Sequence, residues 1–410
     1  MSRRFVAAGH ELAPRLQDAE LHVINSCTVT HLAARTSRKT ARRGHRLDPA
    51  MRTVLTGCYA TGSPEEAAAL AGVDLVVTNE HKDELVERVH AAFPEAIPSG
   101  SAALDIPYVP LDFGLSRALV KVEDGCNMRC SFCIIPLTRG RQRSRTVQDV
   151  VEEVRSLAAG GYPEVVVTGV QISEYRDGDR RLFDLVAALL EQTDVRRLRL
   201  TSIAPWKFDR RLLSLWQDER LCRHVHMSLQ SGCTETLRRM RRPYSAAQYA
   251  ELAEELRQAI PNLALTTDVI VGFPGETDAE FEASLHFVEE LKFAKPHIFT
   301  YSPRDGTRAA GMSDQVEPQT KKQRVAAMLA VAEASERDFA ASQIGEASTV
   351  VWEERKSSPD GLGRRWTGLT DHYVRVWAEP EDTDNLSGRL ERVRLTRAVV
   401  GGAMAERLAA

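Results

Sequence analysis

Six short apolar runs, each followed by a helical segment, constrain the fold of this chain more than any other feature. The runs cover residues 118–124, 164–170, 197–203, 224–230, 263–273 and 296–302. The first helix has a clear start, where Thr146 and Asp149 form a capping-box pattern, and a clear end at Gly160–Gly161. Repeated strand–helix units build a parallel sheet, so residues 118–340 are predicted to form a partial (β/α)6 barrel. Chemistry in such barrels gathers at the C-terminal ends of the strands.

Three cysteines follow the first predicted strand of this barrel. Cys126, Cys130 and Cys133 have a C-x3-C-x2-C spacing. Three thiolates can bind three irons of a [4Fe–4S] cluster, which leaves the fourth iron open to another ligand. The alternative is a stripe of buried thiols, because positions i, i+4 and i+7 share one face of a helix. Gly125 and the polar run 127–129 do not continue an amphipathic helix, so the spacing favours the cluster.

The composition is that of an ordinary globular protein. Of its 410 residues 43% are hydrophobic, and the formal charge of −3 gives no global sign of nucleic-acid binding. No apolar run approaches the roughly 18 residues of a membrane span, and the first residues are too polar for a secretory signal. Seven cysteines with a cluster-type spacing indicate a reducing compartment. We therefore expect a cytoplasmic protein of about two to four domains with no membrane partner.

Residues 1–97 are predicted to form a separate α/β domain. Apolar runs at 21–26, 53–57 and 74–77 alternate there with helical stretches, and a linker at 98–117 follows. Cys27 and Cys58 each come after a predicted strand, so both are expected at one sheet edge, where they can share a ligand. The alternative is two unrelated small buried residues, which is our expectation for Cys222 and Cys233.

Residues 341–410 are predicted to form a small β-barrel. Strand-like runs cover 348–354, 364–378 and 390–400. In the middle run, two valines fall on one face, and Tyr373, Arg375 and Trp377 fall on the other. That second face suits stacking on bases with phosphate pairing. Packing of the same face against the preceding barrel is an equal alternative.

Runs of arginine lie beside predicted active-site loops. Arg141, Arg143 and Arg145 follow the cysteine loop, and Arg241 and Arg242 follow the fourth strand of the barrel. Charge runs are usually solvated faces, but clusters near a catalytic mouth attract a polyanion. We therefore predict RNA contact at these five residues.

The cysteine spacing, with Phe132 before the last cysteine, resembles that of the radical S-adenosylmethionine (SAM) enzymes. The resemblance implies that SAM binds the open iron near Phe132, and that a donor such as flavodoxin or ferredoxin supplies an electron. Two further segments resemble SAM-binding segments of these enzymes: residues 268–277, which implicate Ile270 and Gly272 near the adenine, and residues 168–175, which implicate Gly169 near the amino group. Ser228 and Gln230 are expected as polar groups at the barrel mouth. Plain strand-end turns and hydrogen bonds without a ligand are the alternatives.

The order of motifs along the whole chain resembles a methylthiotransferase. INSCTVT, TGCYA, the cysteine loop, LQSG, GFPGET and the terminal β domain follow one another as in that family. The resemblance implies an N-terminal α/β domain, a radical SAM barrel and a C-terminal RNA-binding TRAM domain. It also implies a second [4Fe–4S] cluster on three cysteines, two of which match Cys27 and Cys58. The third would precede the first residue of this chain, so the first domain is expected to be incomplete and the second cluster to belong to a longer form.

Two local segments resemble one branch of the family. CIIPLTRGRQRSR at 133–145 and YSPRDGTRAAGM at 301–312 resemble the MtaB branch. That branch adds a 2-methylthio group to N6-threonylcarbamoyladenosine beside the anticodon, which makes the tRNA anticodon arm the expected partner. The alternatives are the MiaB type, acting on isopentenyladenosine in tRNA, and the RimO type, acting on an aspartate of a ribosomal protein. A further alternative is a tRNA-binding protein that has lost sulfur transfer.

Overall fold

The computed structural model describes residues 1–98, 116–379 and 384–408, so most of the predicted linker at 98–117 lies outside the described residues. The chain forms two compact units. The first comprises Met1–Leu111, Gly125–Gln142 and Ser302–Gly311; the second comprises Asp112–Asp124, Arg143–Tyr301 and Met312–Ala410. This division follows spatial contacts and joins the cysteine loop to the N-terminal residues. The three consecutive domains therefore stay a prediction.

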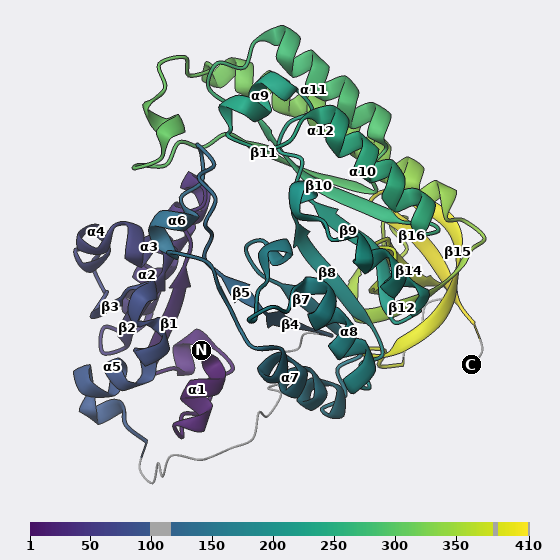
Figure 1. Cartoon of the computed structure of the whole chain (residues 1–410). Coiled ribbons are helices and arrows are strands. Elements are labelled where there is room, and N and C mark those ends of the chain that lie inside the picture. The colour runs from purple at the N-terminus through teal and green to yellow at the C-terminus, as the bar shows by residue number, and fades with distance from the viewer. Residues whose placement is uncertain (99–115, 380–383, 409–410) are drawn as a thin grey trace. The chain divides into compact units, whose positions relative to one another are not determined.

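A three-stranded parallel sheet forms the centre of the first unit (Figure 1). Its strands are β1 (Leu21–Ser26), β2 (Arg52–Gly57) and β3 (Leu75–Val77), each within one residue of the predicted run. The helices are α1 (Ser2–Ala7), α2 (His31–Leu47), α3 (Cys58–Gly62), α4 (Pro64–Ala68), α5 (Leu85–Ala92) and α6 (Ile135–Thr138). Successive side chains of β2 alternate between two cores: Leu55 packs with α2 and α3, and Val54 packs with α1 and α5.

A six-stranded parallel sheet forms the centre of the second unit and confirms the predicted partial barrel. Its strand order is β11-β10-β9-β8-β7-β4, so β4 and β11 are its edges. The strands are β4 (Arg117–Lys121), β7 (Glu164–Thr168), β8 (Leu198–Ile203), β9 (Leu221–Met227), β10 (Ala264–Val271) and β11 (Lys295–Thr300). A short antiparallel pair, β5 (Glu123–Asp124) and β6 (Arg143–Ser144), flanks the cysteine loop in the chain.

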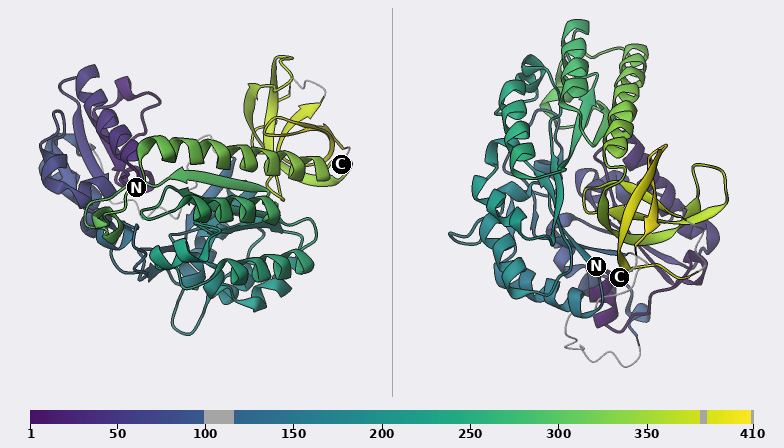
Figure 2. Two further views of the ribbon diagram at one scale, coloured as in Figure 1. Left: turned by 90° about the horizontal axis from the view of Figure 1, so that it is seen from above. Right: turned by 90° about the vertical axis from the view of Figure 1, so that its right-hand side faces the viewer.

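Helices cover one face of this sheet, which leaves the other face as the inner wall, or lumen, of the partial barrel (Figure 2). They are α7 (Val147–Ala159), α8 (Leu182–Gln192), α9 (Thr234–Arg239), α10 (Ala246–Ala259), α11 (Asp278–Leu291) and α12 (Pro318–Ser342). The predicted start of α7 is confirmed, since the Thr146 hydroxyl accepts a hydrogen bond from the Asp149 N–H at 3.1 Å. The strand predicted at 224–230 is observed at Leu221–Met227 instead, and Gln230 has a left-handed φ of +70°.

The C-terminal residues form a closed five-stranded barrel, as predicted. Its strands are β12 (Ala347–Ser357), β13 (Arg364–Thr370), β14 (Arg375–Glu379), β15 (Leu390–Val399) and β16 (Gly402–Arg407). The run predicted as one strand at 364–378 is two strands, because Tyr373 has a φ of +66° in a turn that the Thr370 N–H closes on the Val374 carbonyl. Strand β16 was not predicted.

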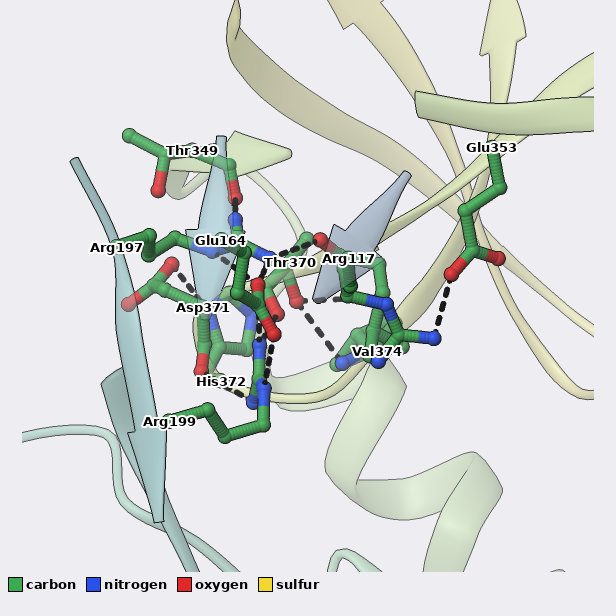
Figure 3. A network of polar contacts seen from close by, with 11 residues as sticks. Arg117, Glu164, Arg197, Arg199, Thr349, Glu353, Thr370, Asp371, His372 and Val374 are labelled. Carbon is green, nitrogen blue, oxygen red and sulfur yellow. Dashed lines mark hydrogen bonds and ion pairs between the residues drawn. The ribbon is translucent and has the colours of Figure 1, made fainter. Parts of the chain in front are cut away.

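A buried polar network attaches the C-terminal barrel to the parallel sheet (Figure 3). Glu164, at the start of β7, accepts hydrogen bonds from Nε of Arg197 at 2.6 Å and from Nε of Arg199 at 2.8 Å. All three side chains are almost fully buried. A buried carboxylate between two guanidinium groups is the arrangement that makes such burial tolerable.

The remaining guanidinium N–H groups reach backbone carbonyls of the C-terminal barrel. Arg197 donates to the Thr349 and Leu369 carbonyls at 3.0 and 2.7 Å. Arg199 donates to the Thr370 and Asp371 carbonyls at 2.9 and 3.0 Å. Since these arginines lie at the amino end of β8, the C-terminal barrel closes the amino end of the parallel sheet. The carboxyl ends of the strands, where chemistry is expected, remain at the opposite end.

Candidate active site

The cysteine loop is an irregular segment whose base is closed by one backbone hydrogen bond. The Cys126 N–H donates to the Gly140 carbonyl at 3.1 Å. Gly125 has a φ of +77°, and a Cβ there would lie 2.2 Å from the Arg141 carbonyl oxygen, so only glycine fits. No helix runs through 125–133. The alternative of three thiols on one helix face is therefore wrong.

The thiol groups of this loop suit a [4Fe–4S] cluster. Cys126, Cys130 and Cys133 are free of disulfides and partly exposed, and the Met128 N–H lies 3.4 Å from the Cys126 sulfur as a donor. Among the described residues, no three His, Cys, Asp or Glu side chains are grouped as ligands of a single ion. A cluster does not need such a group, because each thiolate binds a different iron of the cube.

Cys27 and Cys58 lie at the carboxyl edge of the N-terminal sheet, as predicted. Ser26 and Gly57 are paired at the ends of parallel strands β1 and β2, so the cysteines that follow them come next at that edge. Cys58 is buried and Cys27 is partly exposed. Their role as ligands stays a prediction. Cys222 and Cys233 are buried, as expected for small structural residues.

Two polar side chains that sequence analysis missed contact the Cys58 sulfur. Nε of Arg139 donates to Sγ at 3.2 Å, and Nδ2 of Asn79 lies 3.8 Å from it. The same Asn79 amide donates to the Thr138 carbonyl at 2.8 Å, which ties the helix after the cysteine loop to α3. Arg139 lies two residues before Arg141, the first of the arginines predicted to contact RNA, and no sequence signal distinguishes it from them.

A buried carboxylate explains the glycine predicted near the SAM amino group. Oε1 of Glu123 accepts a hydrogen bond from the Gln171 N–H at 2.6 Å, and a Cβ on Gly169 would lie 2.2 Å from that oxygen. Oε2 has no hydrogen-bond partner among the described residues. Burial raises the pKa of Glu123 to about 7, against the effect of the backbone donors Gln171 and Val170. Sequence analysis missed Glu123.

The other residues predicted at the barrel mouth lie at the ends of β9 and β10. The Gln230 N–H donates to the Asp268 carbonyl and the Gln230 carbonyl accepts from the Ile270 N–H, both at 2.8 Å, so backbone pairing continues past the end of β9. Ser228 and Ile270 are partly exposed. Gly272 has a φ of +75°, and a Cβ there would lie 2.5 Å from the Lys321 side chain. Gln230, Ile270 and Gly272 thus have a structural reason beside their predicted roles, and the SAM contacts of all four residues stay predictions.

The five arginines predicted to contact RNA differ in their availability. Arg141, Arg143 and Arg241 are exposed. Arg145 instead forms an ion pair with Glu153. The Arg242 guanidinium lies over the Trp206 ring, 4.9 Å from its centroid. The first three are therefore the better candidates for phosphate contact.

The predicted aromatic face of the C-terminal barrel packs within the second unit. The Tyr373 ring stacks on His224 of β9, with ring centroids 4.2 Å apart and planes 7° apart. Arg375 forms an ion pair with Glu353, and Trp377 is 9% exposed. The expectation of an open base-stacking face at these residues is wrong, and the packing alternative describes them. The alternation of residues in the sequence does not reveal the turn at Tyr373, whose ring packs on β9.

Comparison with known proteins agrees with this geometry. The chain matches the Radical SAM superfamily over residues 120–288 and Uncharacterized protein family UPF0004 over residues 1–78. The solved structure of the radical S-adenosylmethionine methyltransferase TsrM from Kitasatospora setae is similar in fold, with a TM-score of 0.57 and 16% identity over 76% of this chain and 79% of that chain. The partial barrel and the cysteine loop define a radical SAM enzyme.

Curated relatives match along nearly the whole chain. Threonylcarbamoyladenosine tRNA methylthiotransferase MtaB of Bacillus subtilis (strain 168) is 34% identical over 96% of this chain and 89% of its own length. A tRNA-2-methylthio-N(6)-dimethylallyladenosine synthase of Geobacillus thermodenitrificans is 34% identical over 97% of this chain and 78% of its own length. The chain belongs to the radical SAM methylthiotransferase family. The predicted enzyme class and its cofactors, a [4Fe–4S] cluster and SAM, are thereby confirmed. No helix of the described residues has the length and apolarity to cross a membrane.

Proposed function

We propose that this enzyme adds a 2-methylthio group to N6-threonylcarbamoyladenosine beside the anticodon of tRNA. Coverage of the relatives supports this choice of substrate. The chain spans 89% and 92% of the MtaB proteins of Bacillus subtilis and Aquifex aeolicus. It spans 78% and 77% of two dimethylallyladenosine synthases of similar identity. Among these four relatives the chain thus spans more of the first group's length, and dimethylallyladenosine is the second candidate substrate.

The residues assigned to the cofactors are those that the family resemblance implicates. Cys126, Cys130 and Cys133 hold the radical cluster, and Cys27 and Cys58 are ligands of a second cluster. The residues assigned to SAM binding are Phe132, Gly169, Ser228, Gln230, Ile270 and Gly272. When bound, the cluster and SAM supply a radical able to remove hydrogen from an unactivated C–H carbon.

The chain itself orients and shields these groups. The closed base of the cysteine loop fixes the three thiols relative to one another, and the Met128 N–H stabilises negative charge on the Cys126 sulfur. The Glu123 carboxylate fixes the 169–171 turn by accepting a hydrogen bond from the Gln171 backbone N–H.

The tRNA anticodon arm is the proposed partner of the exposed arginines. Arg141, Arg143 and Arg241 are placed to contact phosphates, which supply affinity without sequence information. Splayed bases of an anticodon loop then present the target nucleoside to the enzyme. Seven free cysteines favour a cytoplasmic location, where flavodoxin or ferredoxin can supply the electron.

Nucleoside mass spectrometry of tRNA tests this function. The host makes threonylcarbamoyladenosine but lacks its methylthiotransferase, and it expresses either the wild-type chain or a variant with Cys126, Cys130 and Cys133 replaced by alanine. We expect 2-methylthio-N6-threonylcarbamoyladenosine from the wild type and none from the variant.

Two other outcomes have definite meanings. A methylthio group on isopentenyladenosine instead would assign the chain to the second candidate substrate. Soluble protein that carries both clusters and modifies neither nucleoside would overturn the proposed tRNA activity and direct the search to the aspartate of a ribosomal protein.

A further inference from the structure

Three polar side chains of the second unit gather in the lumen of the partial barrel. On β10, Thr267 faces the outer helices, because its hydroxyl lies 3.4 Å from the Tyr249 hydroxyl of α10. The neighbouring residue Asp268 therefore points to the lumen. His297 of β11 is its partner in register, and His226 of β9 reaches the same carboxylate. We call His226, Asp268 and His297 the lumen cluster.

Hydrogen bonds fix the lumen cluster on the side of β9. Nε2 of His226 lies 3.3 Å from Oδ2 of Asp268, and its Nδ1 lies 3.0 Å from the Thr266 hydroxyl. The same hydroxyl lies 2.9 Å from Nε2 of His224, whose ring is stacked on Tyr373 of the C-terminal barrel. A hydroxyl donates one proton, so at most one of these imidazole nitrogens accepts from it and at least one donates to it. The C-terminal barrel thus helps to orient His226 through a chain of contacts that runs from Tyr373 to His224 and then to the Thr266 hydroxyl.

The other side of the lumen cluster keeps unused hydrogen-bonding groups. Among the described residues, Oδ1 of Asp268 and both ring nitrogens of His297 have no hydrogen-bond partner. The His226 and Asp268 side chains are 17% and 30% exposed, so they are neither core residues nor fully solvated ones. Polar groups in a partly enclosed wall are normally satisfied by a ligand or water.

We propose that the lumen cluster binds the polar edge of the target purine base. The inference rests on the proposed tRNA function and extends it to residues that recognise the base. An adenine edge presents an acceptor nitrogen beside an N–H donor, which matches an imidazole N–H beside a carboxylate oxygen. The carboxylate of Asp268 repels phosphate, so the cluster suits a base rather than the backbone. Ile270 lies two residues further along β10 on the same face, toward the end expected to bind SAM.

A thermodynamic cycle tests the contact with the base. The binding of two labelled anticodon stem-loops, one intact and one abasic at the target position, is measured by fluorescence anisotropy on the cluster-loaded enzyme. Loss of the base should weaken wild-type binding by about 5-fold to 150-fold, the range for a paired base contact. The Asp268→Asn variant should lack most of the base-dependent part of the affinity. Removal of the base should therefore weaken binding to this variant only slightly.

Two variants make the cycle decisive. His297→Gln should behave as Asp268→Asn does, whereas His286→Gln, an exposed histidine on α11, should behave as the wild type. Equal abasic losses in wild type and in both lumen variants would overturn the proposal. So would a wild type that binds both stem-loops equally while it modifies tRNA. Failure of the proposed function is seen separately, as absence of methylthio product from the wild type on every nucleoside.

Discussion

Removal of the charge of Glu164 should weaken the attachment of the C-terminal barrel. This carboxylate is fully buried and lies between Arg197 and Arg199, which in turn hold four backbone carbonyls of that barrel. Glu164→Gln keeps the shape of the side chain but leaves two buried guanidinium groups without a counter-charge. The perturbation therefore acts on electrostatics and not on volume.

The expected magnitude follows from the pKa of Glu164. Burial alone would raise this pKa, but Arg197 and Arg199 more than offset burial and hold it at about 2, against an ordinary value of 4.5. That difference corresponds to about 3 kcal/mol of stability at neutral pH. Breaking a buried ion pair by removing one partner typically costs about 3–5 kcal/mol, so the two arguments agree.

Urea unfolding of wild type and Glu164→Gln at several pH values measures this loss. A group with a lowered folded pKa stabilises the protein above its unfolded pKa, so the difference should be full above pH 4.5 and disappear as the pH falls toward 2. Glu255→Gln, which breaks the exposed ion pair with Arg210, should cost less than about 1 kcal/mol. Equal unfolding midpoints for wild type and Glu164→Gln at pH 7 would refute the reasoning.

Three further changes test other parts of the molecule. Glu123→Gln should stabilise the protein at pH 8 by up to about 3 kcal/mol, because burial raises the pKa of this carboxyl from 4.5 to about 7. The same change should have little effect on stability below pH 4.5, and urea unfolding at both pH values measures the difference. Gly57→Ala should lower the melting temperature more than Gly161→Ala does. Both glycines have a positive φ, but only a Cβ added at Gly57 would clash with a backbone carbonyl oxygen, at 2.4 Å. Arg139→Gln should lower the free energy of unfolding by about 1 kcal/mol, because it removes the hydrogen bond from Nε to the buried Cys58 sulfur; urea unfolding measures the change.

Local patterns were sufficient to predict the two parallel sheets. Apolar runs of strand length with helices between them specify parallel sheets, and Thr146 with Asp149 marks a helix start through a hydrogen bond between near neighbours. The position of Cys27 and Cys58 was predictable for the same reason. Each follows a strand directly, and parallel strands bring their carboxyl ends to one edge.

Side-chain partners distant in sequence were not predictable in this way. Arg139 and Arg141 belong to one arginine run, yet Arg139 contacts a thiol 81 residues away and Arg141 is exposed. The alternation around Tyr373 fits an RNA-facing surface and a docked surface equally well. Only the turn at φ +66° and the stacked ring on β9 decide between them.

The docked position of the C-terminal barrel constrains where it can contact RNA. The turn that carries Tyr373 is used for attachment, so the predicted aromatic face is unavailable to stack on bases. Strand β15 instead presents Arg392 and Arg394 as exposed side chains, which alternate with buried Val393 and Leu395. Basic side chains on one face, backed by a core, suit contact with phosphates but carry no base specificity. The proposed recognition of the base then falls to the lumen cluster of the parallel barrel, which the same attachment reaches through Tyr373 and His224.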